Sequence, residues 1–255
     1  MPRTGERGGP QTRARISEAA TRLFLERGFD TVTVAEVARE AGVSSVTVFK
    51  HFPRKEDLLL DRTVDAVELL RAAVRDRTPG VDVTESLRGT ALRLVDGRHP
   101  LSGVDERSVP FFRTVAASPA LVARAREIAA DLQHTLTEEL AHDPAFEGDG
   151  PLLAAFFIAG YATVLMETAR RLIAGEPPSS VVDDHRARVE HLFVALRSGV
   201  APGPEGPGGE SPGREGPRRP ARRRRSPAAR QADDPRCTSL ADHRRCPSCT
   251  SPSND

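Results

Sequence analysis

Residues 33–52 read TVAEVAREAGVSSVTVFKHF, and this stretch decides the fold of the N-terminal part of the chain. Thr33 and Glu36 have the spacing of a capping box, which predicts that a short helix begins after Thr33. Gly42 permits the positive φ of a tight turn, and Ser44 is a favoured N-cap for a second helix. The stretch therefore predicts two short helices joined by a glycine turn.

The apolar spacing divides each of these helices into an inner and an outer face. The first helix has one buried stripe, made of Val34, Val37, Ala38 and Ala41. In the second helix Val48 and Phe52 lie four residues apart and face inward. The residues left facing outward are small, apolar or basic: Ser45, Val46, Thr47, Phe49 and Lys50. A second helix of this kind suits insertion into the major groove of DNA.

The rest of the chain up to Ser198 also has helical periodicity and no convincing strand pattern. A first amphipathic helix has its apolar residues at i, i+3, i+4, i+7 and i+8, namely Ile16, Ala19, Ala20, Leu23 and Phe24, and Gly28 ends it. Further helices are expected near 55–77, 84–97, 105–117, 119–142, 151–175 and 180–198. The predicted fold class is all-α.

The run from Ile16 to Leu60 resembles the DNA-binding domain of the tetracycline-repressor (TetR) family. The resemblance rests on Ala19-Ala20, Leu23-Phe24, Gly28-Phe29, Thr33, Val37-Ala38, Ala41-Gly42-Val43-Ser44, Thr47, Phe49, Phe52-Pro53, Lys55-Glu56 and Leu58. It implies an N-terminal three-helix helix-turn-helix domain, followed by a helical domain that binds a ligand and dimerises. It also implies a repressor that binds a palindromic operator as a homodimer and is released by a small-molecule effector.

The resemblance implies DNA contacts at Thr33, Ser44, Ser45, Val46, Thr47, Phe49, Lys50, His51 and Lys55. Lys50 can donate to guanine and Val46 can pack on a thymine methyl group, whereas His51 and Lys55 sit where relatives contact the DNA backbone. Two residues depart from the family pattern. Phe49 stands where many relatives have tyrosine, and Val46 replaces a smaller residue, so we expect a base preference of its own.

The helix expected at 151–175 is apolar nearly all round, so it must be buried on most sides, by its own chain or by a partner subunit. The resemblance implies that the last two helices form a four-helix dimer interface, and the expected interface residues are Val189, Leu192, Phe193 and Leu196. The alternative is that both helices only complete a monomeric core. The expected lining of an effector pocket for an apolar or amphipathic molecule is Phe111, Phe112, Phe156, Phe157, Tyr161 and Met166.

These patterns predict four segments: a flexible arm at 1–10, a DNA-binding domain at 11–56, an effector and dimerisation domain at 57–198 and a disordered tail at 199–255. The tail is rich in Pro, Gly, Arg and Ser and has too few large apolar residues to form a core. Its run Arg222–Arg225 is either a non-specific nucleic-acid contact or a charged tail. Cys246 and Cys249, with Cys237 and His243 nearby, have no supporting apolar residues, and we predict no metal site there.

Composition and motifs argue against other classes of protein. The apolar stretch Leu152–Met166 is too short to span a bilayer, and the polar start is unlike a signal peptide, so a cytoplasmic protein without a membrane partner is expected. No enzyme motif is present, and no cofactor is expected. Asp183, Asp184, His185 and His191 are interpreted as a solvated surface. The alternatives are a TetR-like regulator without a ligand and an all-helical enzyme or carrier.

Overall fold

A computed structural model describes residues 8–199 of the chain, and within that range it contains helices and no strand, which confirms the all-α prediction. The helices are α1 (Gly8–Arg27), α2 (Val34–Glu40), α3 (Ser45–His51), α4 (Thr63–Arg75), α5 (Val83–Asp96), α6 (Val109–Ala117), α7 (Pro119–Ala141), α8 (Gly150–Ile173) and α9 (Pro178–Gly199). Three short 3-10 helices join them: η1 (Glu56–Leu58), η2 (Pro100–Ser102) and η3 (Glu106–Ser108). The predicted arm at 1–10 overlaps the first turn of α1; its residues 1–7, and the predicted tail from residue 200 onward, lie outside the described residues.

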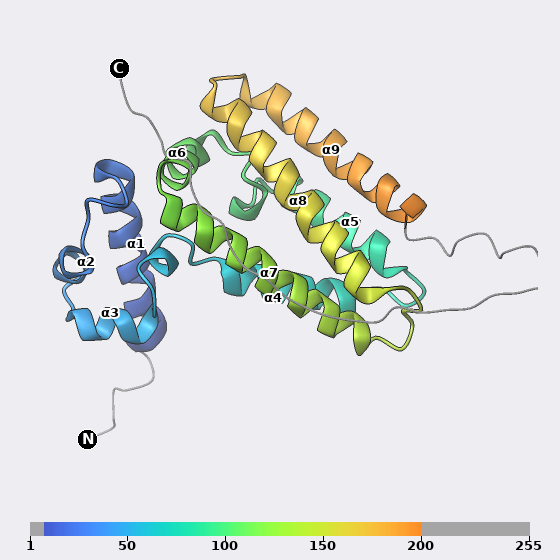
Figure 1. The fold of residues 1–255 in the computed structure, drawn as a ribbon, viewed down its shortest axis with the longest axis horizontal. Coiled ribbons are helices and arrows are strands. Elements are labelled where there is room, and N and C mark those ends of the chain that lie inside the picture. The colour runs from blue at the N-terminus through green and yellow to red at the C-terminus, as the bar shows by residue number, and fades with distance from the viewer. Residues whose placement is uncertain (1–7, 200–255) are drawn as a thin grey trace, which may run out of the picture. The chain divides into compact units, whose positions relative to one another are not determined.

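The buried apolar side chains form two clusters, one for each half of the described chain. The first cluster belongs mainly to α1, α2, α3 and η1, and its fully buried members include Ile16, Phe24, Val37 and Val48. The second cluster belongs to α4, α5, α7, α8 and α9. Figure 1 shows α1, α2 and α3 as one group and the longer helices as another.

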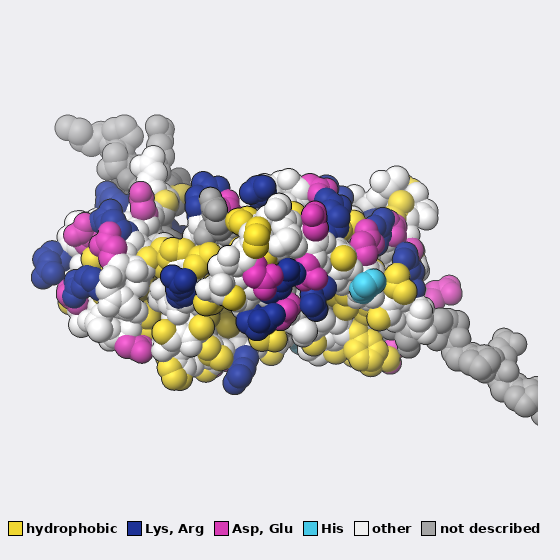
Figure 2. Space-filling view, turned by 90° about the horizontal axis from the view of Figure 1, so that it is seen from above, with side chains coloured by type: hydrophobic (Ala, Val, Ile, Leu, Met, Phe, Trp, Pro, Cys, Tyr) yellow, Lys and Arg dark blue, Asp and Glu magenta, His cyan; other side chains and the backbone are white. Residues whose placement is uncertain are grey.

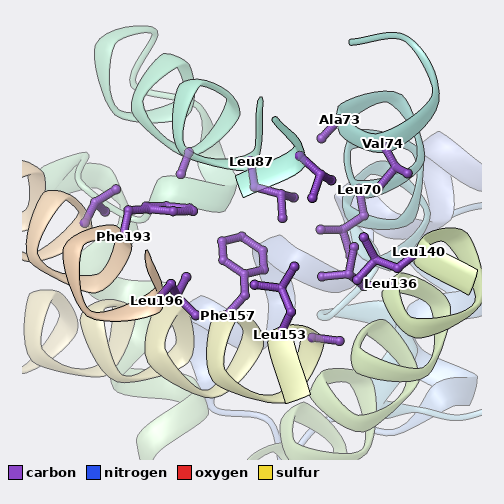
Figure 3. Close-up of a cluster of buried hydrophobic side chains, with 14 of the residues drawn as sticks. Leu70, Ala73, Val74, Leu87, Leu136, Leu140, Leu153, Phe157, Phe193 and Leu196 are labelled. Atoms are coloured by element: carbon purple, nitrogen blue, oxygen red, sulfur yellow. The ribbon is translucent and has the colours of Figure 1, made fainter. Parts of the chain in front are cut away.

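The second cluster is formed where the long helices cross. Figure 3 shows Leu87 of α5, Leu153 and Phe157 of α8, and Phe193 of α9 pointing toward one another. The rings of Phe157 and Phe193 lie 5.6 Å apart, a distance typical of packed aromatic pairs. This cluster holds α9 against its own chain.

The structure corrects the predicted dimer interface. Val189 and Phe193 are fully buried and Leu196 is 3% exposed, all three within the second cluster of the same chain. Leu192 is half-buried and lies against Gly160 of α8, close enough that a Cβ at Gly160 would clash with its methyl groups. Val189, Phe193 and Leu196 therefore face the core of their own chain, whereas Leu192 keeps part of its side chain exposed.

The face of α8 that points away from this core is apolar and exposed. Leu152, Phe156 and Met166 of α8 are 39%, 47% and 65% exposed, and Val194 of α9 is 54% exposed. By length and composition alone α8 would be able to cross a membrane, which corrects the expectation drawn from the shorter stretch Leu152–Met166, and 28% of its most apolar window is buried. Figure 2 shows apolar side chains at several places on one face of the molecule, between charged ones.

His185 is buried, which corrects its interpretation as part of a solvated surface. It lies on α9 in register with Val181 and Val189, four residues to either side, so it shares their inward face. The hydroxyl of Thr168 on α8 donates to the carbonyl oxygen of Val164 at 2.9 Å and lies 2.8 Å from His185 Nδ1. Because this hydroxyl has one proton to donate, His185 Nδ1 must be the donor in the second bond.

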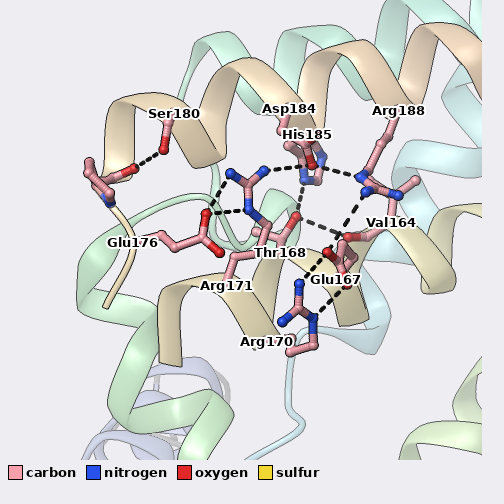
Figure 4. Close-up of polar contacts among 11 residues, drawn as sticks. Val164, Glu167, Thr168, Arg170, Arg171, Glu176, Ser180, Asp184, His185 and Arg188 are labelled. Atoms are coloured by element: carbon pink, nitrogen blue, oxygen red, sulfur yellow. Dashed lines mark hydrogen bonds and ion pairs between the residues drawn. The ribbon is translucent and has the colours of Figure 1, made fainter. Parts of the chain in front are cut away.

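Charged side chains surround this buried histidine on the solvent side of α8 and α9, as Figure 4 shows. Arg171 contacts Glu176 at 2.6 Å and Asp184 at 2.9 Å, and Arg188 contacts Asp184 at 2.6 Å. Hydrogen bonds from Arg188 and Arg171 lower the pKa of Asp184. The arginine pairs therefore tie the end of α8 to the beginning of α9.

We expect His185 to make the folded chain less stable as the pH falls. Burial lowers the pKa of His185 from 6.5 to about 4, so the unfolded chain binds its proton first. The contribution of neutral His185 to the free energy of unfolding is fully present above pH 6.5 and is lost as the pH falls toward 4. At pH 4.5 the loss is about 2–3 kcal/mol. Urea unfolding of the wild type and of His185→Gln between pH 7 and 4.5 measures this loss. The pKa values of Glu36 and Asp105 are lowered to about 2, so these two carboxylates change the stability mainly below pH 4.5.

The glutamine variant is the control for that measurement because it is polar and does not titrate. We expect its stability to change less with pH than that of the wild type over the same range. Parallel pH curves for the two proteins would contradict the assignment of this pH dependence to His185.

Candidate nucleic-acid interface

The two short helices of the quoted stretch form as the local signals predict. Thr33 caps α2, with its side chain accepting from the backbone N–H of Glu36 while the Glu36 carboxylate accepts from the N–H of Thr33. Gly42 has a φ of 64° in the turn, a conformation that side chains disfavour. Ser44 caps α3 by accepting from the N–H of Thr47 at 3.1 Å. The chain thus enters α3 at a fixed angle.

The acidic side of α2 is neutralised by α1. Arg27 pairs with Glu36 at 2.8 Å, and Arg22 pairs with Glu40. Hydrogen bonds from Thr33 and then from Arg27 lower the pKa of Glu36 to about 2. The carboxylates of α2 are therefore occupied by arginines of α1, which leaves less negative charge to repel a phosphate backbone.

The outer face of α3 is the most exposed part of the motif. Val48 points inward and is fully buried, whereas Val46 is 81% exposed and Phe49 is 51% exposed. The Lys50 side chain is exposed as well and forms no hydrogen bond or ion pair with residues 8–199. The structure thus brings Ser44 and the outward residues of α3 together on one surface: Ser45, Val46, Thr47, Phe49 and Lys50.

Two predicted contacts have other roles in the structure. The ammonium group of Lys55 donates to the carbonyl oxygen of Phe29 at 2.6 Å and lies 4.2 Å from the centre of its ring. Burial lowers the pKa of Lys55. His51 is half-buried at the end of α3, and its carbonyl oxygen accepts from Arg13 at 2.9 Å. Lys55 and Arg13 hold the domain together, and the DNA contacts predicted for Lys55 and His51 stay predictions.

Thr33 keeps its place at the edge of the surface, although its hydroxyl is already bonded. It donates to Glu36 Oε2 at 2.8 Å, so a phosphate would have to compete with a carboxylate for that proton. Arg39 was missed by the sequence analysis. Its side chain is exposed on α2 and forms no hydrogen bond or ion pair within the described part of the chain. Its signal in the sequence was its spacing from Ala35, four residues earlier, on the face opposite the buried stripe.

The group of α1, α2 and α3 is joined to the longer helices by contacts with α6 and α7. Leu121 of α7 is fully buried in the first cluster, and Ser118 donates to Asp30 at 3.0 Å. Arg124 donates to Asp57 at 2.8 Å. These contacts link α7 to α1, to η1 and to the loop before α2.

The residues predicted to line an effector pocket do not surround one cavity. Phe156 and Met166 are exposed, Phe157 is in the second cluster, and Phe111 packs against the first. Of the other two, Phe112 lies beside Gly103, and the Tyr161 hydroxyl donates to Leu101 at 3.4 Å. Two hollows of about 230 and 250 Å³ lie elsewhere, one between α4 and the end of α7 and the other beside the end of α3.

Comparisons with known proteins agree with the motif. Residues 16–61 match the model of a family described as bacterial regulatory proteins, tetR family. The HTH-type transcriptional regulator TcmR of Streptomyces glaucescens is 28% identical over 158 residues, which cover 60% of this chain and 70% of TcmR. The regulator HbdR of Aromatoleum sp. (strain CIB) is 43% identical over 49 residues, which cover 19% of this chain and 21% of HbdR.

The solved structures give the same result for the fold. A SmeT–triclosan complex aligns with a TM-score of 0.51 and 19% identity, covering 80% of this chain and 100% of that one. The likeness includes helices of both halves, since it extends over four-fifths of the chain. It shows that the arrangement of a small N-terminal group and a larger helical group is shared.

Proposed function

Because the chain belongs to the TetR family of bacterial transcriptional regulators, we propose that it is a cytoplasmic repressor that binds a palindromic operator as a homodimer. In this proposal a small-molecule effector releases it from the DNA. The observation that carries the proposal is the exposed outer face of α3, with Lys50 free and Val46 extended into solvent. Its size and shape suit the major groove.

The exposed apolar face of α8 and α9 supports the homodimer. We assign the interface to Phe156, Met166 and Val194, with Leu152 at one end, in place of the buried stripe of α9. Phe156, Ala159, Thr163 and Met166 are spaced by three, four and three residues, the spacing of a seam between packed helices. A second copy of the same two helices would bury this face, which water otherwise covers.

The contacts of α6 and α7 with the DNA-binding domain support the response to an effector. Leu121, Ser118 and Arg124 tie the position of α7 to α1, η1 and the loop before α2. A ligand that shifts α6 or α7 would change the distance between the two copies of α3 in the dimer. Operator binding depends on that distance because the two half-sites are one helical turn of DNA apart.

The test is selection of binding sites from random double-stranded DNA with the full-length chain. We expect the enriched sequences to share a palindrome whose half-sites lie about 34–36 Å apart, and the selected DNA to bind by fluorescence anisotropy at nanomolar protein. Binding that is equally tight on every sequence would contradict the proposal.

We expect Lys50→Ala to weaken binding to the selected DNA by about 1–3 kcal/mol and to relax the base preference at one position, because it removes a donor from the groove. Arg93→Ala is the control, since Arg93 is exposed on α5 in the regulatory half. Anisotropy titrations at one salt concentration compare the two variants. Equal affinities of Lys50→Ala and Arg93→Ala would remove Lys50 from the contact surface.

A further inference from the structure

His185 is a fully buried side chain, and one of its two ring nitrogens has no partner. Its Nδ1 donates to the Thr168 hydroxyl, which itself donates to the carbonyl oxygen of Val164. The proton of the neutral ring is therefore on Nδ1, and Nε2 has only a lone pair. No donor within residues 8–199 bonds to this nitrogen, and it is buried away from solvent. An unpaired acceptor in a protein core raises the free energy of the folded chain.

The charge state of His185 decides which kind of group can bind there. Burial lowers the pKa of His185 to about 4, although the neighbouring Asp184 raises it, so the ring is neutral at pH 7. Nε2 is therefore an acceptor at this pH. A hydroxyl or an N–H group can donate to it, whereas a carboxylate has no proton to donate.

One stripe of α8 contacts both His185 and the segment from η2 to α6. Tyr161, Leu165 and Thr168 lie at i, i+4 and i+7 and so share a face of the helix. The Tyr161 ring stands edge-on to the His185 ring, with 6.2 Å between the ring centres. The Tyr161 hydroxyl donates to Leu101 of η2 at 3.4 Å, which is a long hydrogen bond.

The helix α6 packs loosely on this side of α8. None of its residues is buried, although its sequence VPFFRTVAA is mostly apolar. The Phe112 ring lies on Gly103 beside Leu165, because a Cβ at Gly103 would be 2.6 Å from the ring and 3.5 Å from Leu165. The helices α5, α8 and α9 all contribute buried side chains to the second cluster. Of these neighbours, α6 is therefore the one that can be displaced at the lowest cost.

We propose that His185 Nε2 binds a hydroxyl or N–H group of the effector, in a site between α6 and the Tyr161 side of α8. The effector is then a neutral molecule with an apolar body and at least one hydrogen-bond donor. Its apolar body packs on Tyr161, Leu165 and Phe112, and its donor gives Nε2 the missing partner. The inference rests on the proposed function, in which an effector exists, and it names the chemical class of that effector.

Three small molecules of similar size separate the donor from the apolar body. Cyclohexanol has a hydroxyl group, methoxycyclohexane has a methyl group in place of that proton, and cyclohexanecarboxylate is anionic at pH 7. Tyr161 is the only tyrosine of the chain, which has no tryptophan, so tyrosine fluorescence reports on this site. None of the probes is aromatic, so none interferes with that signal. Each is titrated into the full-length chain up to about 5 mM.

We expect cyclohexanol to bind the wild type with a dissociation constant on the order of 1 mM, about three- to tenfold more tightly than the other two probes. His185→Leu removes the acceptor but leaves Thr168 bonded to Val164, and it should lose this preference. His185→Gln supplies an acceptor oxygen and should recover part of it. His134→Leu is the matched control, since His134 is 75% exposed on α7, and it should keep the full preference.

Equal affinities of cyclohexanol and methoxycyclohexane for the wild type would overturn the inference, as would an unchanged preference in His185→Leu. A fluorescence signal that no probe changes would also overturn it, because the site would then admit no molecule of this class. These measurements contain no DNA, so each of these results leaves operator binding intact. Failure of the DNA selection to enrich any sequence would instead reject the proposed function, even if the preference for cyclohexanol were present.

Discussion

Replacing Met166 and Val194 together by glutamate is expected to turn the proposed dimer into a monomer and to abolish tight operator binding, although α3 is unchanged. Both side chains are more than half exposed in the single chain, so their replacement leaves the core of each subunit intact. In a two-fold interface each new carboxylate would be buried near its copy in the other subunit with no cation to pair with it. This would weaken dimerisation by several kcal/mol. Loss of the second half-site should reduce operator affinity by on the order of a hundredfold or more.

Sedimentation, far-UV circular dichroism and anisotropy measure the three parts of this prediction. Val64→Glu is the control, because Val64 is 56% exposed on α4, away from α8 and α9; this variant should remain a dimer. By contrast, Leu196→Glu would place a charge in the second cluster and should unfold the chain. A Met166→Glu, Val194→Glu protein that stayed dimeric would contradict the assignment of this face.

Phe193→Ala is expected to be the most destabilising truncation of a single side chain. Its ring is fully buried in the second cluster, 5.6 Å from the ring of Phe157, so its removal leaves a cavity between α5, α8 and α9. The expected loss is about 3–5 kcal/mol of the free energy of unfolding, with a fall in Tm of about 10 °C. Urea unfolding followed by circular dichroism measures it.

Val64→Ala provides the comparison, since it also shortens an apolar side chain, but an exposed one. Its midpoint of unfolding should stay close to that of the wild type. If Phe193→Ala and Val64→Ala unfolded at the same urea concentration, α9 would not be held by this core.

The sequence predicts the DNA-binding motif well because its signals are local. The capping box at Thr33, the positive φ at Gly42 and the Ser44 cap each involve residues within a few positions of one another. Such signals fix the backbone before any tertiary contact is considered. The inward direction of Lys55 depends instead on the carbonyl oxygen of Phe29, which is distant in sequence, and the sequence gives no sign of it.

In the regulatory half, the apolar spacing of a helix shows which face is buried but not what buries it. The stripe of Val189, Phe193 and Leu196 correctly identifies the buried face of α9, but not whether its own chain or a partner buries it. The same stripe includes His185, four residues before Val189, although the neighbouring acidic and basic residues suggest a surface. The period of the helix was the better guide to His185 than its charged neighbours.

Leu121 has a practical meaning for exchanging parts between regulators. It comes from α7, yet its side chain fills space inside the core of α1, α2 and α3, and Ser118 at the same corner holds Asp30. A chimera joined just after η1 would include all of α1, α2 and α3. Without Leu121, however, it would have a cavity in the first cluster. No single position along the chain therefore separates the first cluster from the rest of the structure. A graft needs the corner between α6 and α7, or a replacement side chain of the same shape.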